Sequence, residues 1–114
     1  MESVEALRIE SRTEQGRIVV RLGGELDMAS APLLQSALEE AEKEASATLV
    51  LDLNELRFMD STGLRIILWA AERCRNVGQQ FALTPGASQV QRLLAVSGVG
   101  ERVRIIATPD EMLV

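Results

Sequence analysis

The segment TLVLDLNELRFMDSTGLRIIL, residues 48–68, changes partway along from a strand pattern to a helix pattern. Its first part, TLVLDL at 48–53, is a short and nearly continuous apolar run, which is typical of a strand covered on both faces. Apolar residues then recur at helical spacing, and Gly78 suits a helix C-terminus, so we expect a helix over 61–77. The segment between them, 54–59, is expected to connect the strand to the helix.

Patterns on either side extend this strand–helix unit. Two alternating runs, 7–12 and 17–22, flank TEQG at 13–16 and predict an antiparallel pair joined by a four-residue hairpin loop, after which GGELD at 23–27 should turn the chain. Further strands are expected at 80–84 and 102–107, helices at 30–45 and 85–98, and another helix start at 108–111. Strand–helix–strand crossovers pair strands in parallel. The sequence therefore predicts one α/β domain over 1–114, with a mixed β-sheet (an N-terminal antiparallel hairpin plus parallel strands) and helices packed on the sheet.

Composition excludes several classes of function. The 114 residues include 12 basic and 17 acidic side chains, a formal charge of −5, which argues against nucleic acid as a partner. Histidine is missing and Cys74 is the only cysteine, which excludes a Ser-His-Asp triad, a Cys-His pair and the usual zinc sites. We therefore expect no metal and no cofactor. No apolar run approaches the roughly 20 residues of a membrane helix, and MESVEALRIE is unlike a signal peptide, so we expect a cytoplasmic protein without direct membrane contact.

The turn between the strand and the helix contains Asp60, Ser61, Thr62 and Gly63, and three interpretations of this run compete. In the first, Asp60 or Ser61 only caps the helix by accepting a hydrogen bond from its first turn. In the second, Ser61 is a nucleophile, but MDSTG keeps only the serine and the second glycine of the G-x-S-x-G elbow, and no histidine can take the proton. In the third, Ser61 accepts a phosphoryl group, which a helix N-terminus tolerates electrostatically. Because the second interpretation fails, we expect no enzymatic activity.

The helix that follows this turn offers a candidate partner surface. At about 100° per residue, one side of it forms an apolar stripe that should face the core, namely Leu64, Ile67, Leu68, Ala71 and Cys74. Arg65 and Arg73 lie on the opposite side, and Trp69 lies among the polar residues. Trp69 is either an exposed interface anchor or a ring folded over an apolar shoulder of the same helix. Met59, which precedes the turn, is a further candidate contact with a partner.

Four segments resemble, in order, the STAS domain of anti-sigma factor antagonists: GELD within 23–27, LVLDL at 49–53, LRFMDSTGLRIIL at 56–68 and LLAVSGV at 93–99. The resemblance covers nearly the whole chain, and FMDSTGL is its most specific part. It implies that Ser61 is phosphorylated by the anti-sigma factor, a serine kinase of the histidine-kinase ATPase type. It also implies that Asp27, Asp60, Thr62 and Gly63 support the phosphosite, and that a phosphatase acting on phosphoserine restores the unmodified form.

The resemblance implies a binding protein whose unphosphorylated form binds the anti-sigma factor and frees the sigma factor. One alternative is a permanent STAS accessory subunit of a lipid-transport ABC complex or of a stress-signalling assembly, in which the hydroxyl is only a cap. A small hydrolase is a third possibility. Members of the family usually end in a full helix, whereas only a short final helix is expected after 108–111.

Overall fold

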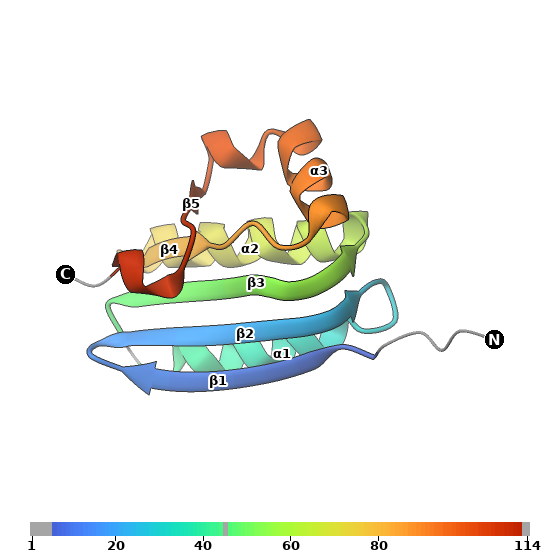
Figure 1. The fold of residues 1–114 in the computed structure, drawn as a ribbon. Helices are drawn as coiled ribbons and strands as arrows, with labels where there is room; N and C mark the ends of the chain where they lie inside the picture. The colour runs from blue at the N-terminus through green and yellow to red at the C-terminus, as the bar shows by residue number, and fades with distance from the viewer. Residues whose placement is uncertain (1–5, 45, 113–114) are drawn as a thin grey trace.

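The computed structural model describes residues 6–44 and 46–112 (Figure 1). Five strands form one sheet in the order β1-β2-β3-β4-β5; β1 and β2 are antiparallel, and all other neighbours are parallel. The strands are β1 (Arg8–Glu14), β2 (Arg17–Leu26), β3 (Thr48–Met59), β4 (Gln80–Leu83) and β5 (Arg104–Ile105), and the helices are α1 (Ala31–Glu42), α2 (Ser61–Val77) and α3 (Ser88–Ser97). The predicted α/β class and mixed sheet are confirmed.

The main core lies between the sheet and the helices α1 and α2, which cover the same face of the sheet (Figure 1). Alternate residues of β2 and β3 point into this core and are at most 4% exposed: Ile18, Val20, Leu22, Leu49, Leu51 and Leu53. They meet Leu34 and Leu38 from α1 and Ile67 and Ala70 from α2. Each helix buries one stripe because residues three and four positions apart share a face.

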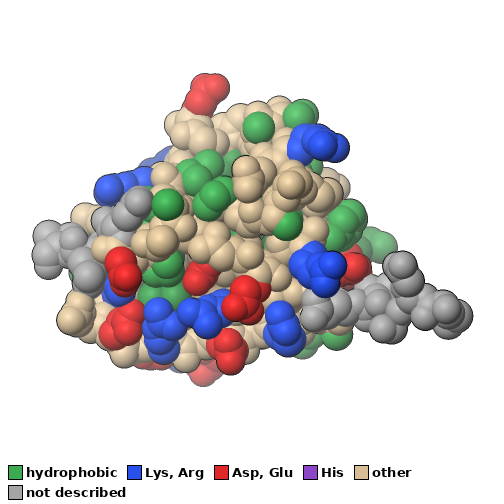
Figure 2. Space-filling model, viewed as in Figure 1, with side chains coloured by type: hydrophobic (Ala, Val, Ile, Leu, Met, Phe, Trp, Pro, Cys, Tyr) green, Lys and Arg blue, Asp and Glu red, His purple; other side chains and the backbone are tan. Residues whose placement is uncertain are grey.

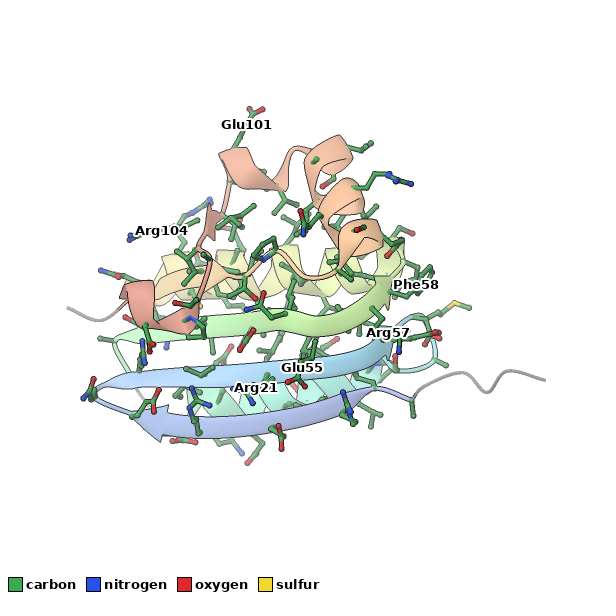
Figure 3. The ribbon with its side chains drawn as sticks, viewed as in Figure 1. Arg21, Glu55, Arg57, Phe58, Glu101 and Arg104 are labelled. Carbon is green, nitrogen blue, oxygen red and sulfur yellow. The ribbon has the colours of Figure 1, made fainter. Side chains whose placement is uncertain are left out.

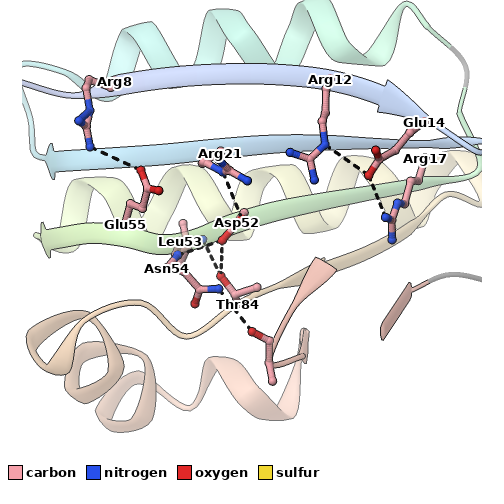
Figure 4. Close-up of polar contacts among 11 residues, drawn as sticks. Arg8, Arg12, Glu14, Arg17, Arg21, Asp52, Leu53, Asn54, Glu55 and Thr84 are labelled. Carbon is pink, nitrogen blue, oxygen red and sulfur yellow. Dashed lines mark hydrogen bonds and ion pairs between the residues drawn. The ribbon is translucent and has the colours of Figure 1, made fainter. Parts of the chain in front are cut away.

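The other face of the sheet has a smaller buried cluster, which consists of Val19, Val50, Ala82 and Ile106. Ile106 follows β5, so the C-terminal segment covers this part of the sheet. Nearer to β1 the face is charged (Figure 2), and the Arg21 guanidinium lies 3.5 Å from the carboxylate of Asp52 (Figure 4). Asp52 is only 5% exposed. Residues 48–53 of β3 are therefore covered on both faces, as predicted.

The connection between β1 and β2 has two residues, Gln15 and Gly16, and the four-residue loop predicted at 13–16 is wrong. Both residues have positive φ, 52° and 78°, as a type I′ turn requires. The pairing therefore continues to Glu14 opposite Arg17. This turn type matches the right-handed twist of the strands, so β1 extends two residues past its predicted end.

β2 and β3 continue past their predicted ends, and the turn predicted at 23–27 and the connection predicted at 54–59 are both wrong. The two strands pair in parallel as far as Leu26 opposite Met59. The register shifts near Gly23, where a Cβ would lie 2.1 Å from Nη2 of Arg8 in β1. The glycine therefore permits a close approach within an irregular strand. The extra length carries β2 and β3 to the same end of the sheet.

The last strand, the last helix and α1 are shorter than predicted. β5 has two residues instead of spanning 102–107, since it pairs only with Ala82 and Leu83 of β4. The helix predicted to start at 108–111 is a 3-10 turn, η2 (Pro109–Met112). α1 ends at Glu42, before the predicted position 45, which lies outside the described residues.

The remaining helices agree more closely with the sequence. α2 spans 61–77 as predicted, and its C-cap is Gly78, whose φ of 76° favours glycine. α3 starts at Ser88 instead of 85, ends at Ser97 with Gly98 as its C-cap, and is followed by the 3-10 helix η1 (Val99–Glu101). No helix within 6–44 or 46–112 combines the length and the apolar character that crossing a bilayer needs.

Candidate functional site

Asp60 caps α2 and also ties two loops together. Its Oδ1 accepts hydrogen bonds from the backbone N–H groups of Thr62 (2.9 Å) and Gly63 (3.1 Å). Its Oδ2 accepts from the N–H of Met28 (3.2 Å), in the loop between β2 and α1. Its own N–H donates to the carbonyl of Leu26 (3.1 Å). The carboxylate thus satisfies N–H groups that the helix start leaves free, and it joins the loops that follow β2 and β3.

Ser61 is the first residue of α2, and its side chain is exposed. Within the described part of the chain its hydroxyl makes no hydrogen bond, so the capping role belongs to Asp60. The first N–H groups of the helix give this end a partial positive charge. Ser61 also lies just beyond the carboxyl end of β3, where open α/β sheets gather their ligands. An accessible hydroxyl is therefore held in a field that favours negative charge.

The chemistry open to this site is narrow. The oxygens of Asp60 already accept from three backbone N–H groups, and none of the described side chains hydrogen-bonds to Ser61. Over 6–44 and 46–112, no group of three acidic, cysteine or histidine side chains could hold a metal ion. The arrangement presents an exposed hydroxyl at a helix N-terminus, beside the Asp60 carboxylate.

Gly63 lets the first turn of α2 pack closely on the ends of β2 and β3. A Cβ at this position would lie 2.7 Å from Cγ and Cδ2 of Leu26 and 2.8 Å from Cγ of Met59. Both neighbours are fully buried, so neither can swing away into solvent. Thr62, the residue before, is half-buried. Glycine is needed here for space, and the local packing sets where Ser61 stands.

Met59 is 0% exposed, so the prediction that it contacts a partner is wrong. It is the last residue of β3, and its side chain belongs to the main core. Its backbone pairs with the side chain of Gln89 in α3, whose Oε1 accepts from the Met59 N–H (2.9 Å) and whose Nε2 donates to the Met59 carbonyl (3.0 Å). The amide of Gln89 thus substitutes for a neighbouring strand. Sequence reasoning missed Gln89, because a single polar residue in a helix gives no local signal.

Asp27 shapes the loop between β2 and α1. Its carboxylate accepts from the N–H and the hydroxyl of Ser30, both at 3.0 Å, and these bonds hold the pKa of Asp27 below its ordinary value. Within the described residues its hydrogen bonds go to this turn and not to Ser61. The adjacent Met28 is 74% exposed, so an apolar side chain that the sequence did not single out stands beside the site. The link from this loop to Ser61 runs through Asp60.

The buried stripe of α2 differs slightly from the predicted one. Its fully buried side chains are Ile67, Ala70 and Cys74, whereas Leu64, Leu68 and Ala71 are half-buried. Burial raises the pKa of the Cys74 thiol to about 11, and the thiol donates to Oε1 of Gln79 (3.1 Å). Cys74 is therefore a packed and unreactive thiol.

Trp69 is half-buried and packs against the main core, which favours packing over an exposed anchor. The Arg73 guanidinium lies 4.9 Å from the centre of its ring. Arg73 also donates from Nη2 to Oε1 of Glu42 in α1 (2.7 Å), and this hydrogen bond joins α1 to α2. Arg65 is exposed on the first turns of α2. Of the four residues predicted to contact a partner, Arg65 and Arg73 are exposed, and Arg65 is the one nearer to Ser61 in the chain.

Replacing Asp60 with alanine is expected to lower the free energy of unfolding by about 1–2 kcal/mol, because three backbone N–H groups lose their acceptor. Urea unfolding followed by circular dichroism measures this loss. The matched control is Asp60→Asn, which keeps an Oδ1 acceptor and should lose less than half as much. Equal losses in the two variants would contradict the capping role.

The chain is similar to known proteins in both sequence and fold. The family model of the STAS domain matches residues 8–112. An anti-sigma F factor antagonist of Paenibacillus polymyxa is 35% identical over 94 residues, which cover 82% of this chain and 80% of that protein. A crystal structure of an anti-sigma factor antagonist from Mycobacterium paratuberculosis has a TM-score of 0.87 at 23% identity, covering 97% of this chain and 94% of that one.

A third similarity is to the anti-sigma factor antagonist SpoIIAA in its unphosphorylated form, with a TM-score of 0.74 and 26% identity, covering 93% of this chain and 91% of that one. The family match spans nearly all of the described residues, and the sequence similarity to the Paenibacillus protein includes most of the chain. The chain therefore belongs to the STAS domain family, in the group of the anti-sigma factor antagonists.

Proposed function

We propose that this chain is a phosphorylation-controlled antagonist of an anti-sigma factor. Its unphosphorylated form binds an anti-sigma factor that is also a serine kinase of the histidine-kinase-like ATPase type, and this binding releases the sigma factor. Transfer of a phosphoryl group to Ser61 ends the association, and a phosphatase acting on phosphoserine restores it. The observation that carries the proposal is the exposed hydroxyl of Ser61 at the N-terminus of α2, which makes no hydrogen bond within the described residues.

Electrostatics explain how the fold survives this modification. A phosphoryl group adds about −1.5 to −2 charges, and a helix N-terminus stabilises negative charge. Asp60 supplies the cap through its own oxygens, so modification of Ser61 removes no hydrogen bond of the described structure. The charge seen by a partner nevertheless changes greatly, next to the Asp60 carboxylate. Phosphorylation of Ser61 therefore changes the binding of the partner while the domain stays folded.

The chain's own contribution is passive. It presents Ser61 and a surface, while the kinase supplies ATP and magnesium, and we expect the exchange to take place in the cytoplasm. The similarity to SpoIIAA supports the proposal, because SpoIIAA is an anti-sigma factor antagonist and its similar structure is that of an unphosphorylated form. Arg65 and Met28 are the exposed side chains that we place nearest to the kinase.

Incubation with the cognate kinase and ATP is expected to add one phosphoryl group at Ser61, and Ser61→Ala is expected to abolish the addition. Intact-mass and peptide mass spectrometry measure both results. Thr62→Ala is the matched control, since Thr62 is the adjacent hydroxyl and is half-buried; it should be modified as the wild type is. Full modification of Ser61→Ala would show that the acceptor lies elsewhere.

A further inference from the structure

β1 is an edge strand whose charged residues lie on one face. Arg8 forms an ion pair with Glu55 (3.7 Å), and Arg12 forms one with Glu14 (3.3 Å), on the charged face away from α1 and α2 (Figure 4). The intervening residues face the helices: Ile9 packs against the main core, and the Thr13 hydroxyl donates to Glu44 (2.6 Å) after α1. In the order of the chain the exposed face reads Arg, Glu, Arg, Glu. Charges of both signs therefore alternate along this edge.

The backbone of β1 has pairing groups on its outer side. The two-residue turn makes Glu14 and Arg17 a hydrogen-bonded pair, and the bonded pairs then recur at every second residue. The even-numbered residues of β1 thus bond to β2, while the N–H and C=O groups of Ile9, Ser11 and Thr13 point outward. Such a row is a template for another strand.

The sequence of β1, RIESRTE, is complementary to itself when it is reversed about Ser11. We propose that β1 pairs antiparallel with β1 of a second copy of this chain, with the two-fold axis at Ser11. Arg8 then faces Glu14 of the other copy, and Glu10 faces Arg12. All four charged pairs are of opposite sign, and the product is one continuous sheet that runs through both copies.

The hydrogen-bonding pattern and the charges select the same register. Ser11 pairs with Ser11, and Ile9 with Thr13, through their outward backbone groups. The charged residues then occupy the non-hydrogen-bonded positions, where opposing side chains are closest. A shift of two residues in either direction would set Arg12 against Arg12 or Glu10 against Glu10. Like charges in those positions are destabilising, so the register centred on Ser11 is favoured over both of these neighbours.

Glu10 gains most from this pairing. In the hairpin it lies opposite Arg21, but the Arg21 guanidinium turns to Asp52, and Glu10 has no ion pair within the described part of the chain. In the pair of chains its carboxylate meets Arg12 of the other copy. Ser61 follows β3, two strands in from this edge, so pairing through β1 leaves the phosphosite open (Figure 1).

Sedimentation equilibrium at low salt tests the proposal over micromolar to millimolar concentrations. The wild type is expected to dimerise reversibly. Glu10→Arg and Arg12→Glu each set like charges against one another twice per dimer, so each should raise the dimer dissociation constant about tenfold or more. An equimolar mixture of the two variants restores both opposite-charge pairs and should dimerise as the wild type does. The control Glu101→Arg makes the same charge change far from β1 (Figure 3) and should have no effect.

A cysteine pair reports the register independently. In an antiparallel bonded pair the Cα atoms are about 5.5 Å apart, within disulfide reach, so Ser11→Cys should link the two copies under mild oxidation. Thr13 is exposed as Ser11 is, but Thr13→Cys should stay unlinked. Each Thr13 lies opposite Ile9 of the other copy, so the two cysteines would be four residues apart along the strand, about 13 Å. A wild type that stays monomeric at millimolar concentration, mixed variants that fail to associate, or equal linking of both cysteines would each overturn the proposal. Ser61→Ala should dimerise as the wild type does, because pairing through β1 does not need the Ser61 hydroxyl. This result separates the test of the dimer from the test of the phosphosite.

Discussion

Ser61→Asp is expected to weaken the binding of the proposed anti-sigma factor kinase about a hundredfold, which corresponds to a loss of about 3 kcal/mol. The aspartate places a permanent negative charge on the exposed first residue of α2, next to Asp60. Acidic groups of the partner would then face two adjacent carboxylates, and like charges across an interface are costly. Isothermal titration calorimetry with purified kinase measures the change.

The matched control is Ser61→Asn, which has nearly the same size as the aspartate and no charge. It should bind far better than Ser61→Asp if charge is the cause. The free energy of unfolding should fall in neither variant, because a helix N-terminus accommodates an acidic side chain and Ser61 makes no hydrogen bond within the described residues. Equal affinities of Ser61→Asp and the wild type would contradict control by charge repulsion.

Gly63→Ala is expected to lower the free energy of unfolding by about 1–3 kcal/mol through overpacking. The new Cβ would lie 2.7 Å from Cγ and Cδ2 of Leu26 and 2.8 Å from Cγ of Met59, much closer than carbon atoms normally approach. Alanine is the better helix former, by about 1 kcal/mol in an exposed helix. The clash outweighs that gain, because the atoms in the way are buried in the core. Urea unfolding measures the difference.

Gly100→Ala is the control for this substitution. A Cβ there would have only an ordinary contact, 3.6 Å from Cδ1 of Ile105, and the change in stability should be small. If Gly63→Ala proved as stable as Gly100→Ala, the first turn of α2 would have to move outward at little cost. The position of Ser61 would then depend less on packing than we infer. Kinase-dependent phosphorylation of Gly63→Ala would show whether that position matters.

The bounds of α2 could be predicted from local sequence patterns, whereas its buried face could be predicted only in part. An aspartate before the first turn and Gly78 after the last turn supply the hydrogen bonds that a helix cannot make at its ends, so both bounds were predictable. The buried stripe was predicted less well, since Ala70 is buried in place of Ala71. Which of two neighbouring residues is buried depends on the angle at which the helix meets the sheet. Periodicity alone does not contain that angle.

The lengths of β2 and β3 were mispredicted for a related reason. The glycines at 23 and 24 and the polar residues at 54 and 55 favour a turn and a loop when each is considered locally. In the structure the two segments pair with each other, and the hydrogen bonds gained across the sheet outweigh the local preference. Met59 was misplaced by the same error, because a residue assigned to a loop is expected to be exposed.

The α/β class, the antiparallel hairpin, the bounds of α2 and the aspartate–serine pair at its start could be predicted, because these features depend on residues close together in the chain. Other contacts depend on the assembled fold: Asp60 also bonds to Met28, Gln89 holds the end of β3, and Arg73 joins α2 to α1 through Glu42. These contacts join residues about 30 positions apart in the chain. They form only when the sheet and its helices have assembled, so no local pattern encodes them.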